Sequence, residues 1–179
     1  NPFFTFFEAG NRLCGKLYTS HNKLAIMGGS AGGLLVGATL NLAEPGFCKA
    51  AILEVPFVDV INTMLDESLP LTVGEFLEWG NPKIKEQYEY MKSYCPYTNL
   101  SSRTYPAMLV RTSLNDSQVM YWEPAKYVAK LRTLKQGSEP LLFKCNMAAG
   151  HGGASGRYDA LRETAFAYAF LIKNLTDSE

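Results

Sequence analysis

The chain has 179 residues, of which 47% are hydrophobic and 19% are charged, and its 17 basic and 17 acidic side chains give no formal net charge. This length and composition predict one globular domain with a sizeable core, and the absence of net charge excludes a general electrostatic attraction to nucleic acid. The longest apolar run, residues 165–172, is far shorter than the roughly 20 residues that span a bilayer. The expected partners therefore include neither nucleic acid nor a membrane.

The four cysteines form no pattern that is typical of a metal site. They are Cys14, Cys48, Cys95 and Cys145, without a C-x-x-C pair or a neighbouring histidine cluster. A disulfide framework is not expected in a chain of this length. We therefore expect four reduced, half-buried thiols, a cytoplasmic protein and no metal.

The chain opens with a predicted amphipathic helix over residues 3–13, which Asn1 and Pro2 would cap and begin and Gly15 would end. Short apolar segments and helical patterns then alternate. The predicted strands are 24–27, 50–55, 107–112 and 141–145, and the predicted helices are 31–42, 83–92, 124–134 and 158–175. Strands that alternate with helices indicate a parallel sheet that is covered on both faces.

The most informative motif is the run Gly28-Gly29-Ser30-Ala31-Gly32-Gly33, which joins the first strand to the following helix. This is the G-x-S-x-G pattern of a nucleophile elbow, in which a sharp turn projects a strained serine from the sheet. A Cβ at Gly28 or Gly32 would crowd such a turn, and the Ala31 amide at the helix start would face a developing oxyanion. A glycine-rich turn that only packs closely remains the alternative.

Two other glycine motifs do not match the same run. A dinucleotide fingerprint requires glycine where Ser30 stands, and a phosphate loop requires a Lys-Ser or Lys-Thr pair that the run lacks.

A serine nucleophile needs a base, and the chain offers two histidines. His151 follows the strand 141–145, so it is expected at the edge where Ser30 lies. His21 precedes the first strand and is expected at the opposite edge, about 16 Å or more away at ~3.3 Å per residue. We therefore interpret His151 as the base and His21 as a surface residue.

An acid should orient the histidine, and two aspartates follow strands. Asp116 comes directly after 107–112, while Asp59 follows 50–55 and is the rival candidate. Asp66 and Asp159 are interpreted as loop and helix-start charges. The order Ser30, Asp116, His151 is the chain order of the α/β-hydrolases.

Several blocks of sequence together resemble the prolyl oligopeptidase family of serine peptidases, and within it the oligopeptidase B group. The blocks are the elbow, Val55-Pro56-Phe57-Val58-Asp59-Val60, Glu78-Trp79-Gly80-Asn81-Pro82, Tyr121-Trp122-Glu123-Pro124-Ala125-Lys126 and Gly150-His151-Gly152-Gly153. The resemblance covers nearly the whole chain. It implies an α/β-hydrolase fold that is truncated at its N-terminus, without the first strands, and an N-terminal β-propeller elsewhere in the same polypeptide that restricts access to short peptides. It implies no cofactor.

The same resemblance implies roles for individual residues. Ser30 would be the nucleophile, Asp116 the orienting acid and His151 the general base, and cleavage would follow arginine or lysine. Glu75 matches a glutamate associated with the basic P1 side chain, which a carboxylate can bind through charge-assisted hydrogen bonds. Phe57 could add a cation–π contact. The alternatives are a solvated loop charge for Glu75 and a core side chain for Phe57.

Two positions depart from the family pattern. Gln118 replaces an arginine that binds a substrate carbonyl in prolyl oligopeptidases proper, and Leu77 replaces a second acid that some relatives carry near Glu75. The tyrosine that supplies a second oxyanion donor in the family is also absent. Two other interpretations are a carboxylesterase or lipase with the same triad order, and a catalytically incompetent fragment with a bare sheet edge.

Overall fold

The computed structural model describes residues 2–176. Its helices are α1 (Pro2–Gly15), η1 (His21–Lys23), α2 (Ala31–Leu42), α3 (Val60–Leu65), α4 (Phe76–Trp79), α5 (Lys85–Tyr94), α6 (Trp122–Leu134) and α7 (Arg157–Thr176). Its strands are β1 (Ala25–Gly29), β2 (Ala50–Glu54), β3 (Arg103–Thr104), β4 (Ala107–Ser113), β5 (Lys135–Gln136) and β6 (Leu141–Asn146).

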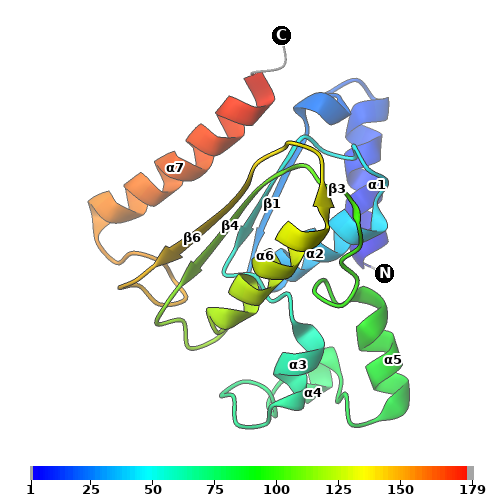
Figure 1. Cartoon of the computed structure of the whole chain (residues 1–179), viewed down its shortest axis with the longest axis vertical. Coiled ribbons are helices and arrows are strands. Elements are labelled where there is room, and N and C mark those ends of the chain that lie inside the picture. The colour runs from blue at the N-terminus through cyan, green and yellow to red at the C-terminus, as the bar shows by residue number, and fades with distance from the viewer. Residues whose placement is uncertain (1, 177–179) are drawn as a thin grey trace.

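The centre of the molecule is a four-stranded parallel sheet in the order β1-β2-β4-β6 (Figure 1). Its register pairs Gly28 with Leu53, Leu53 with Val110, and Val110 with Phe143. The strands run in the same direction, so the segments that follow their carboxyl ends gather at one edge of the sheet. This confirms the predicted parallel sheet.

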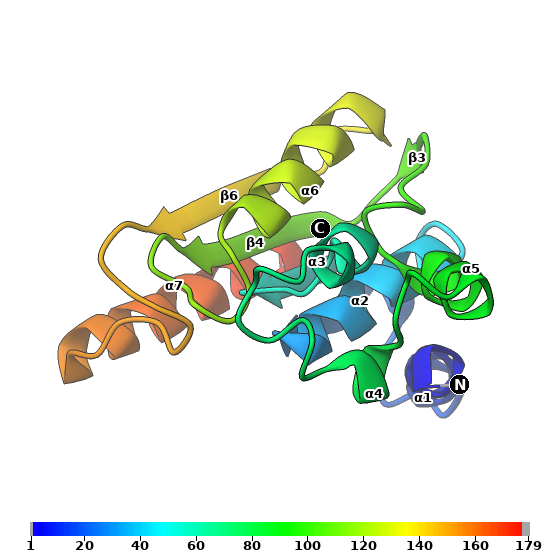
Figure 2. The same ribbon diagram turned by 90° about the horizontal axis from the view of Figure 1, so that it is seen from below.

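Helices cover both faces of this sheet, as Figure 2 shows. On one face, Leu53 and Val110 pack in a cluster with Val36 of α2 and Leu131 of α6. On the other face, Ile52 and Leu109 pack against Ala167 and Phe170 of α7. Because successive strand residues point to opposite faces, the uninterrupted apolar run of β2 contributes side chains to both clusters.

The irregular stretch between β2 and β4 forms a separate layer. Figure 1 shows α3 and α4 beyond the sheet, at the end toward which the arrows point. A second apolar cluster holds this layer in place and includes Phe57, Met64 and Met91 together with Leu34 of α2. This layer is therefore anchored to the same helix that follows the elbow.

The predicted elements differ from the structure mainly at their ends. The structure begins α6 at Trp122, so Pro124 is its third residue rather than its first; the first turn tolerates proline because its N–H groups lack intrahelical acceptors. The parallel pair β3 and β5 was not predicted, since two-residue strands carry no periodicity. The proposed cap Asn1 lies outside the described residues.

The glycines of the elbow are not equivalent. A Cβ on Gly28 would lie 2.2 Å from the Gly32 carbonyl oxygen, and one on Gly33 would lie 2.4 Å from Pro56 Cβ. A Cβ on Gly32 would meet nothing within 4 Å. The expectation of crowding is confirmed at Gly28 and wrong at Gly32, because the helix carries that position away from the strand and turns Gly33 toward Pro56 instead.

This difference gives a matched pair of variants. We expect Gly28→Ala to lower the free energy of unfolding by about 1–3 kcal/mol, since the backbone oxygen that it meets cannot swing away as a side chain can. Gly32→Ala should leave stability unchanged or raise it by up to about 1 kcal/mol, because alanine favours the helix. Urea unfolding of both variants checks this; equal effects would contradict it.

Two cysteines are more buried than expected. Cys14 and Cys145 are half-buried, but Cys48 and Cys95 are fully buried, and all are free thiols. Burial raises the pKa of Cys48 to about 12, so its thiol is protonated and unreactive at neutral pH. None of the helices in residues 2–176 is both long and apolar enough to cross a bilayer.

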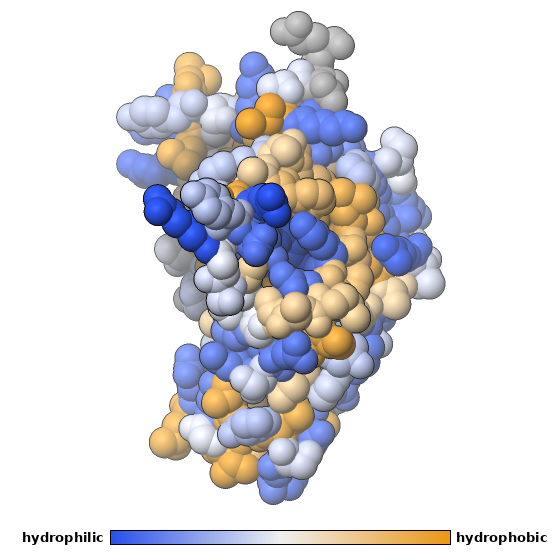
Figure 3. All heavy atoms as spheres, turned by 90° about the vertical axis from the view of Figure 1, so that its left-hand side faces the viewer, coloured by the Kyte–Doolittle hydropathy of each residue, from blue (hydrophilic) through white to orange (hydrophobic). Residues whose placement is uncertain are grey.

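The surface around α7 mixes apolar and hydrophilic side chains (Figure 3). This helix buries Ala167 and Phe170, whereas Tyr158, Leu161 and Ile172 are more than half exposed.

Candidate active site

Ser30 occupies the sharp turn between β1 and α2. Its backbone has φ 53° and ψ −120°, a left-handed conformation that costs a non-glycine residue about 1–3 kcal/mol. The surrounding chain holds it there: the Ser30 N–H donates to the Glu54 carbonyl at 2.9 Å, and the Ser30 carbonyl accepts from the Phe57 N–H at 3.1 Å. The hydroxyl therefore lies on a turn that is fixed to the end of the neighbouring strand.

Asp116 and His151 form a close pair. His151 Nδ1 lies 2.8 Å from Oδ2 and 3.0 Å from Oδ1 of Asp116, and Asp116 is only 4% exposed. The Asp116 Oδ1 also accepts the N–H groups of Gln118 and Val119, each at 2.9 Å. Because a carboxylate only accepts hydrogen bonds, the imidazole donates from Nδ1, which leaves its Nε2 free to accept a proton.

The other sequence candidates lie elsewhere. Asp59 is buried, but its Oδ2 accepts from Lys126 Nζ at 2.6 Å and its Oδ1 accepts from Asn62 Nδ2 at 2.8 Å. His21 is exposed, and its Nδ1 lies 2.8 Å from the Phe47 carbonyl oxygen. The structure thus places Asp116 rather than Asp59 beside His151, and it keeps His21 on the surface as predicted.

Ser30 and His151 both lie beside the end of β2. The Ser30 N–H binds Glu54, and His151 lines a cavity together with Glu54 and Val55. Val55 itself has a φ of 39°, which is rare for a β-branched residue. Within residues 2–176 the Ser30 hydroxyl and the imidazole are not hydrogen-bonded; such contacts often close only when substrate binds.

A second cavity, of roughly 140 Å³, opens next to the serine. Ser30, Ala31 and Phe57 line it from the sheet side, with Glu75 and Gln118 among the residues around it. Glu75 is half-buried, and its Oε2 accepts the Trp79 indole N–H at 2.8 Å.

The side chains around this cavity revise two expectations. Phe57 belongs both to the core and to the cavity wall, and its ring centroid lies 5.3 Å from that of Trp79. Leu77 is fully exposed, whereas Glu78 lines the cavity. A second carboxylate therefore borders the cavity one position after Leu77.

Glu123, for which the sequence predicted no role of its own, binds Thr63, another residue that lines this cavity. It is 2% exposed, and its oxygens accept the Asp59 N–H at 2.7 Å and the Thr63 hydroxyl at 2.8 Å. Burial raises the pKa of Glu123 to about 7, against the lowering effect of these two hydrogen bonds and with a further rise from the Asp59 charge. Glu123 and Thr63 lie sixty positions apart in the chain, so no local pattern in the sequence indicates that they are hydrogen-bonded.

This pKa predicts a pH dependence of stability. Because the folded-state pKa lies above the ordinary value of 4.5, the contribution of Glu123 to the free energy of unfolding is complete below pH ~4.5. It is lost as the pH rises through about 7, and it amounts to roughly 3 kcal/mol. Glu123→Gln should flatten this part of the stability profile in urea unfolding, whereas the exposed Glu86→Gln should leave it unchanged. Identical slopes for Glu123→Gln and the unmodified protein would contradict the assignment.

A parallel sheet covered by helices, with a strained serine after one strand and a paired aspartate and histidine after two others, is the architecture of the α/β-hydrolases. The comparisons with known proteins agree. Residues 1–178 match the model of the prolyl oligopeptidase family, and the chain belongs to that family.

Individual relatives are similar over almost the whole chain. Dipeptidyl aminopeptidase BI of Pseudoxanthomonas mexicana is 51% identical over 98% of this chain and 24% of its own length. Oligopeptidase B from Leishmania major is 46% identical, with a TM-score of 0.91 over 93% of this chain and 23% of that one. Oligopeptidase B from Trypanosoma brucei with covalently bound antipain is also 46% identical, with a TM-score of 0.90 and the same coverage. The chain thus spans about a quarter of the length of these relatives.

Proposed function

We propose that this chain carries the catalytic centre of a serine peptidase that hydrolyses short peptides after arginine or lysine. The observation that carries the proposal is the arrangement at the carboxyl ends of the strands, where a strained Ser30 and the His151 that pairs with Asp116 both adjoin the end of β2. A serine hydroxyl becomes a nucleophile only when a base removes its proton. His151 is the base, and Asp116 holds its tautomer and stabilises the imidazolium that forms.

The reaction proceeds in two halves. The Ser30 oxygen attacks the scissile carbonyl while His151 takes the hydroxyl proton, and the Ala31 N–H at the start of α2 stabilises the oxyanion. His151 then returns the proton to the leaving amine, and an acyl-enzyme remains. Water, activated in turn by His151, releases the acid and regenerates Ser30. The covalently bound antipain in the relative from Trypanosoma brucei supports an enzyme that forms a bond to its ligand.

The residues around the cavity beside Ser30 support the proposal that the P1 side chain of the substrate is basic. Glu75 and Glu78 both border it, and Phe57 supplies an aromatic wall that can face a cation. A carboxylate that is already held by the Trp79 indole at 2.8 Å needs little reorganisation to bind a guanidinium. The peptide substrates of the protein are therefore expected to be cationic at P1.

We also propose that the N-terminal propeller of the family accompanies this domain in the same polypeptide.

A substrate panel tests this function with the protein expressed from its complete coding sequence. Arginyl peptide amides should be cleaved far faster than simple acyl esters of uncharged acids. Preferential hydrolysis of the esters would favour a carboxylesterase. Because one relative is named a dipeptidyl aminopeptidase, the panel includes peptides with free and with blocked N-termini, and cleavage of the blocked peptides identifies an endopeptidase.

Glu75→Gln tests the specificity directly. We expect kcat/KM for an arginyl amide to fall about 10–100-fold, because a hydrogen bond to a charged group contributes about 1.5–3 kcal/mol, while an uncharged norleucyl substrate is affected little. The exposed Glu89→Gln on α5 is the control. An equal loss on both substrates would mean that Glu75 supports the cavity wall rather than the P1 charge.

A further inference from the structure

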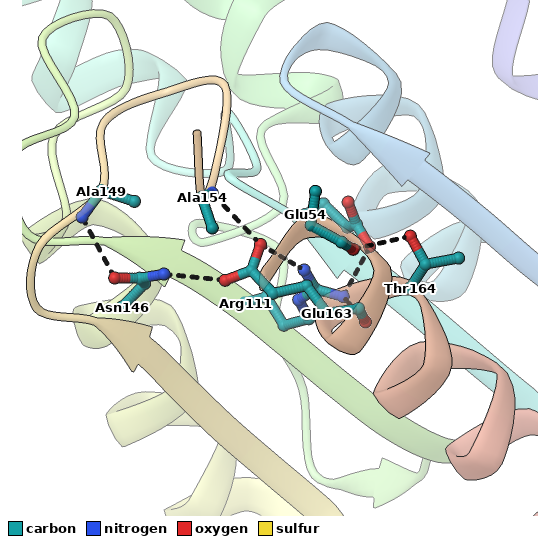
Figure 4. Close-up of polar contacts among 8 residues, drawn as sticks. Glu54, Arg111, Asn146, Ala149, Ala154, Glu163 and Thr164 are labelled. Carbon is teal, nitrogen blue, oxygen red and sulfur yellow. Dashed lines mark hydrogen bonds and ion pairs between the residues drawn. The ribbon is translucent and has the colours of Figure 1, made fainter. Parts of the chain in front are cut away.

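The segment that carries His151 is held at both ends by one polar cluster, which we call the Arg111 cluster: Glu54, Arg111, Asn146 and Glu163 (Figure 4). At the start of the segment, the Asn146 Oδ1 accepts the N–H groups of Ala148 and Ala149, each at 3.0 Å. At its end, the Glu163 Oε2 accepts the Ala154 N–H at 3.4 Å. His151 lies between these two attachment points.

Glu163 is the centre of the cluster. Its Oε1 accepts from Asn146 Nδ2 at 2.8 Å, and Arg111 binds it twice, with Nη2 3.3 Å from Oε2 and Nη1 2.8 Å from the main-chain carbonyl. The side chains of Arg111 and Glu163 are only 14% and 18% exposed. A carboxylate that is bound from three sides in this way fixes the start of α7 relative to the sheet.

The segment also packs tightly over this carboxylate. Gly153 has a φ of 76°, and a Cβ there would lie 3.0 Å from the Glu163 Oε2. A cavity of roughly 100 Å³ separates the rest of the segment from the sheet, and Arg111, Asn146 and Glu163 line it together with His151. The cluster therefore forms the side of this cavity that faces the His151 segment.

The same cluster reaches the serine. Glu54 and Arg111 are partners in the register of β2 and β4, and their side chains form an ion pair at 3.2 Å. The Glu54 carbonyl accepts the Ser30 N–H, and the Arg111 carbonyl accepts the Val55 N–H at 2.7 Å. One set of contacts thus runs from the elbow to the His151 segment, and it is separate from the Asp116 carboxylate that orients the imidazole.

Resting on the proposed function of Ser30 and His151, we propose that Glu163 and Asn146, clamped by Arg111, are positioning residues that hold the His151 segment within reach of the serine hydroxyl. Asp116 sets the tautomer and the ring orientation, while the cluster sets the distance. Proton transfer is sensitive to that distance, because a misplacement of about 1 Å can lower a rate ~100-fold.

The charge state of Glu163 suits this role. Burial opposes its ionisation, but the hydrogen bonds from Asn146 and the Ala154 N–H and the charges of Arg111 and Lys144 lower its pKa below the ordinary value. The charged or titratable groups that line cavities with Glu163 are Arg111 on β4, Glu54 on β2, Lys144 on β6 and His151 on the segment, with Asp159 and Arg162 on α7 itself. Because its folded-state pKa is lowered, the stabilisation from ionised Glu163 is complete above pH ~4.5 and is lost only as the pH falls through the lower folded-state value.

The test uses Glu163→Ala, Asn146→Ala and the conservative Glu163→Gln in the protein expressed from its complete coding sequence. We expect kcat on an arginyl peptide amide to fall about 10–100-fold in both alanine variants, with KM changed less than about twofold. The rate of labelling by a fluorophosphonate probe should fall by the same factor, because labelling also requires an activated Ser30. Glu163→Gln keeps an acceptor for the Ala154 N–H and should recover part of both rates.

The control is Arg162→Ala, which removes an 82% exposed side chain from the adjacent position of α7 and should keep both rates of the unmodified protein. Melting curves give the folded fraction of each variant at the assay temperature. Folded Glu163→Gln and Asn146→Ala proteins with unmodified kcat and labelling rates would overturn the proposal, as would a loss confined to KM. Failure of the unmodified protein to label at Ser30 would instead contradict the proposed function.

Discussion

Ser30→Ala is expected to lower kcat on an arginyl peptide amide by about 10⁵–10⁶-fold and to abolish labelling by a fluorophosphonate probe. In the proposed mechanism, the variant removes the oxygen that forms the bond to the substrate, so no rearrangement of His151 can compensate. The alanine keeps the φ of 53°, which a Cβ tolerates as poorly in alanine as in serine, so the melting temperature should change little. In the unmodified protein, mass spectrometry after labelling should place the probe on the peptide that contains Ser30.

Ser20→Ala is the matched control for this experiment. Ser20 is exposed and precedes β1, at the opposite end of the strand from the elbow. The Ser20→Ala protein should react with the probe and hydrolyse the substrate at the rates of the unmodified protein. Equal labelling of the unmodified protein and Ser30→Ala would show that another residue is the nucleophile, and the proposed mechanism would then be wrong.

Asp116→Asn is expected to lower kcat about 10⁴-fold, with a much smaller effect on KM. An asparagine can still accept the N–H groups of Gln118 and Val119 at Oδ1, which lie 2.9 Å away. Its amide would then face His151 Nδ1 as a donor, and the imidazole would have to accept at Nδ1 and carry its proton at Nε2. In that tautomer His151 cannot take the proton of Ser30.

Two variants separate this effect from a loss of structure. Asp59→Asn changes the rival aspartate, which is paired with Lys126 and not with His151, and should retain most of kcat. Asp159→Asn changes an exposed carboxylate at the start of α7 and should have no effect. A greater loss of kcat in Asp59→Asn than in Asp116→Asn would reverse the assignment of the acid.

The Arg111 cluster shows why sequence patterns predict some parts of a site and not others. Asn146 ends a strand five residues before His151, so its position at the carboxyl edge of the sheet could have marked it for attention. Glu163 carries no such signal, because it is an ordinary polar residue on a long helix. Its carboxylate meets Arg111 only after α7 folds back onto the sheet.

The sequence by itself determined the order of strands and helices, the turn at Ser30 and the return of polar residues at strand ends, because apolar periodicity and small residues act over a few positions of chain. It also sufficed for the resemblance to the family, which residues 1–178 match. Only the tertiary structure decided that Asp116 rather than Asp59 meets His151, that Gly33 rather than Gly32 is crowded, and that Glu163 supports the histidine segment. Each of these depends on contacts between residues far apart in the chain, and such contacts follow from the course of loops between packed layers, which local periodicity does not encode.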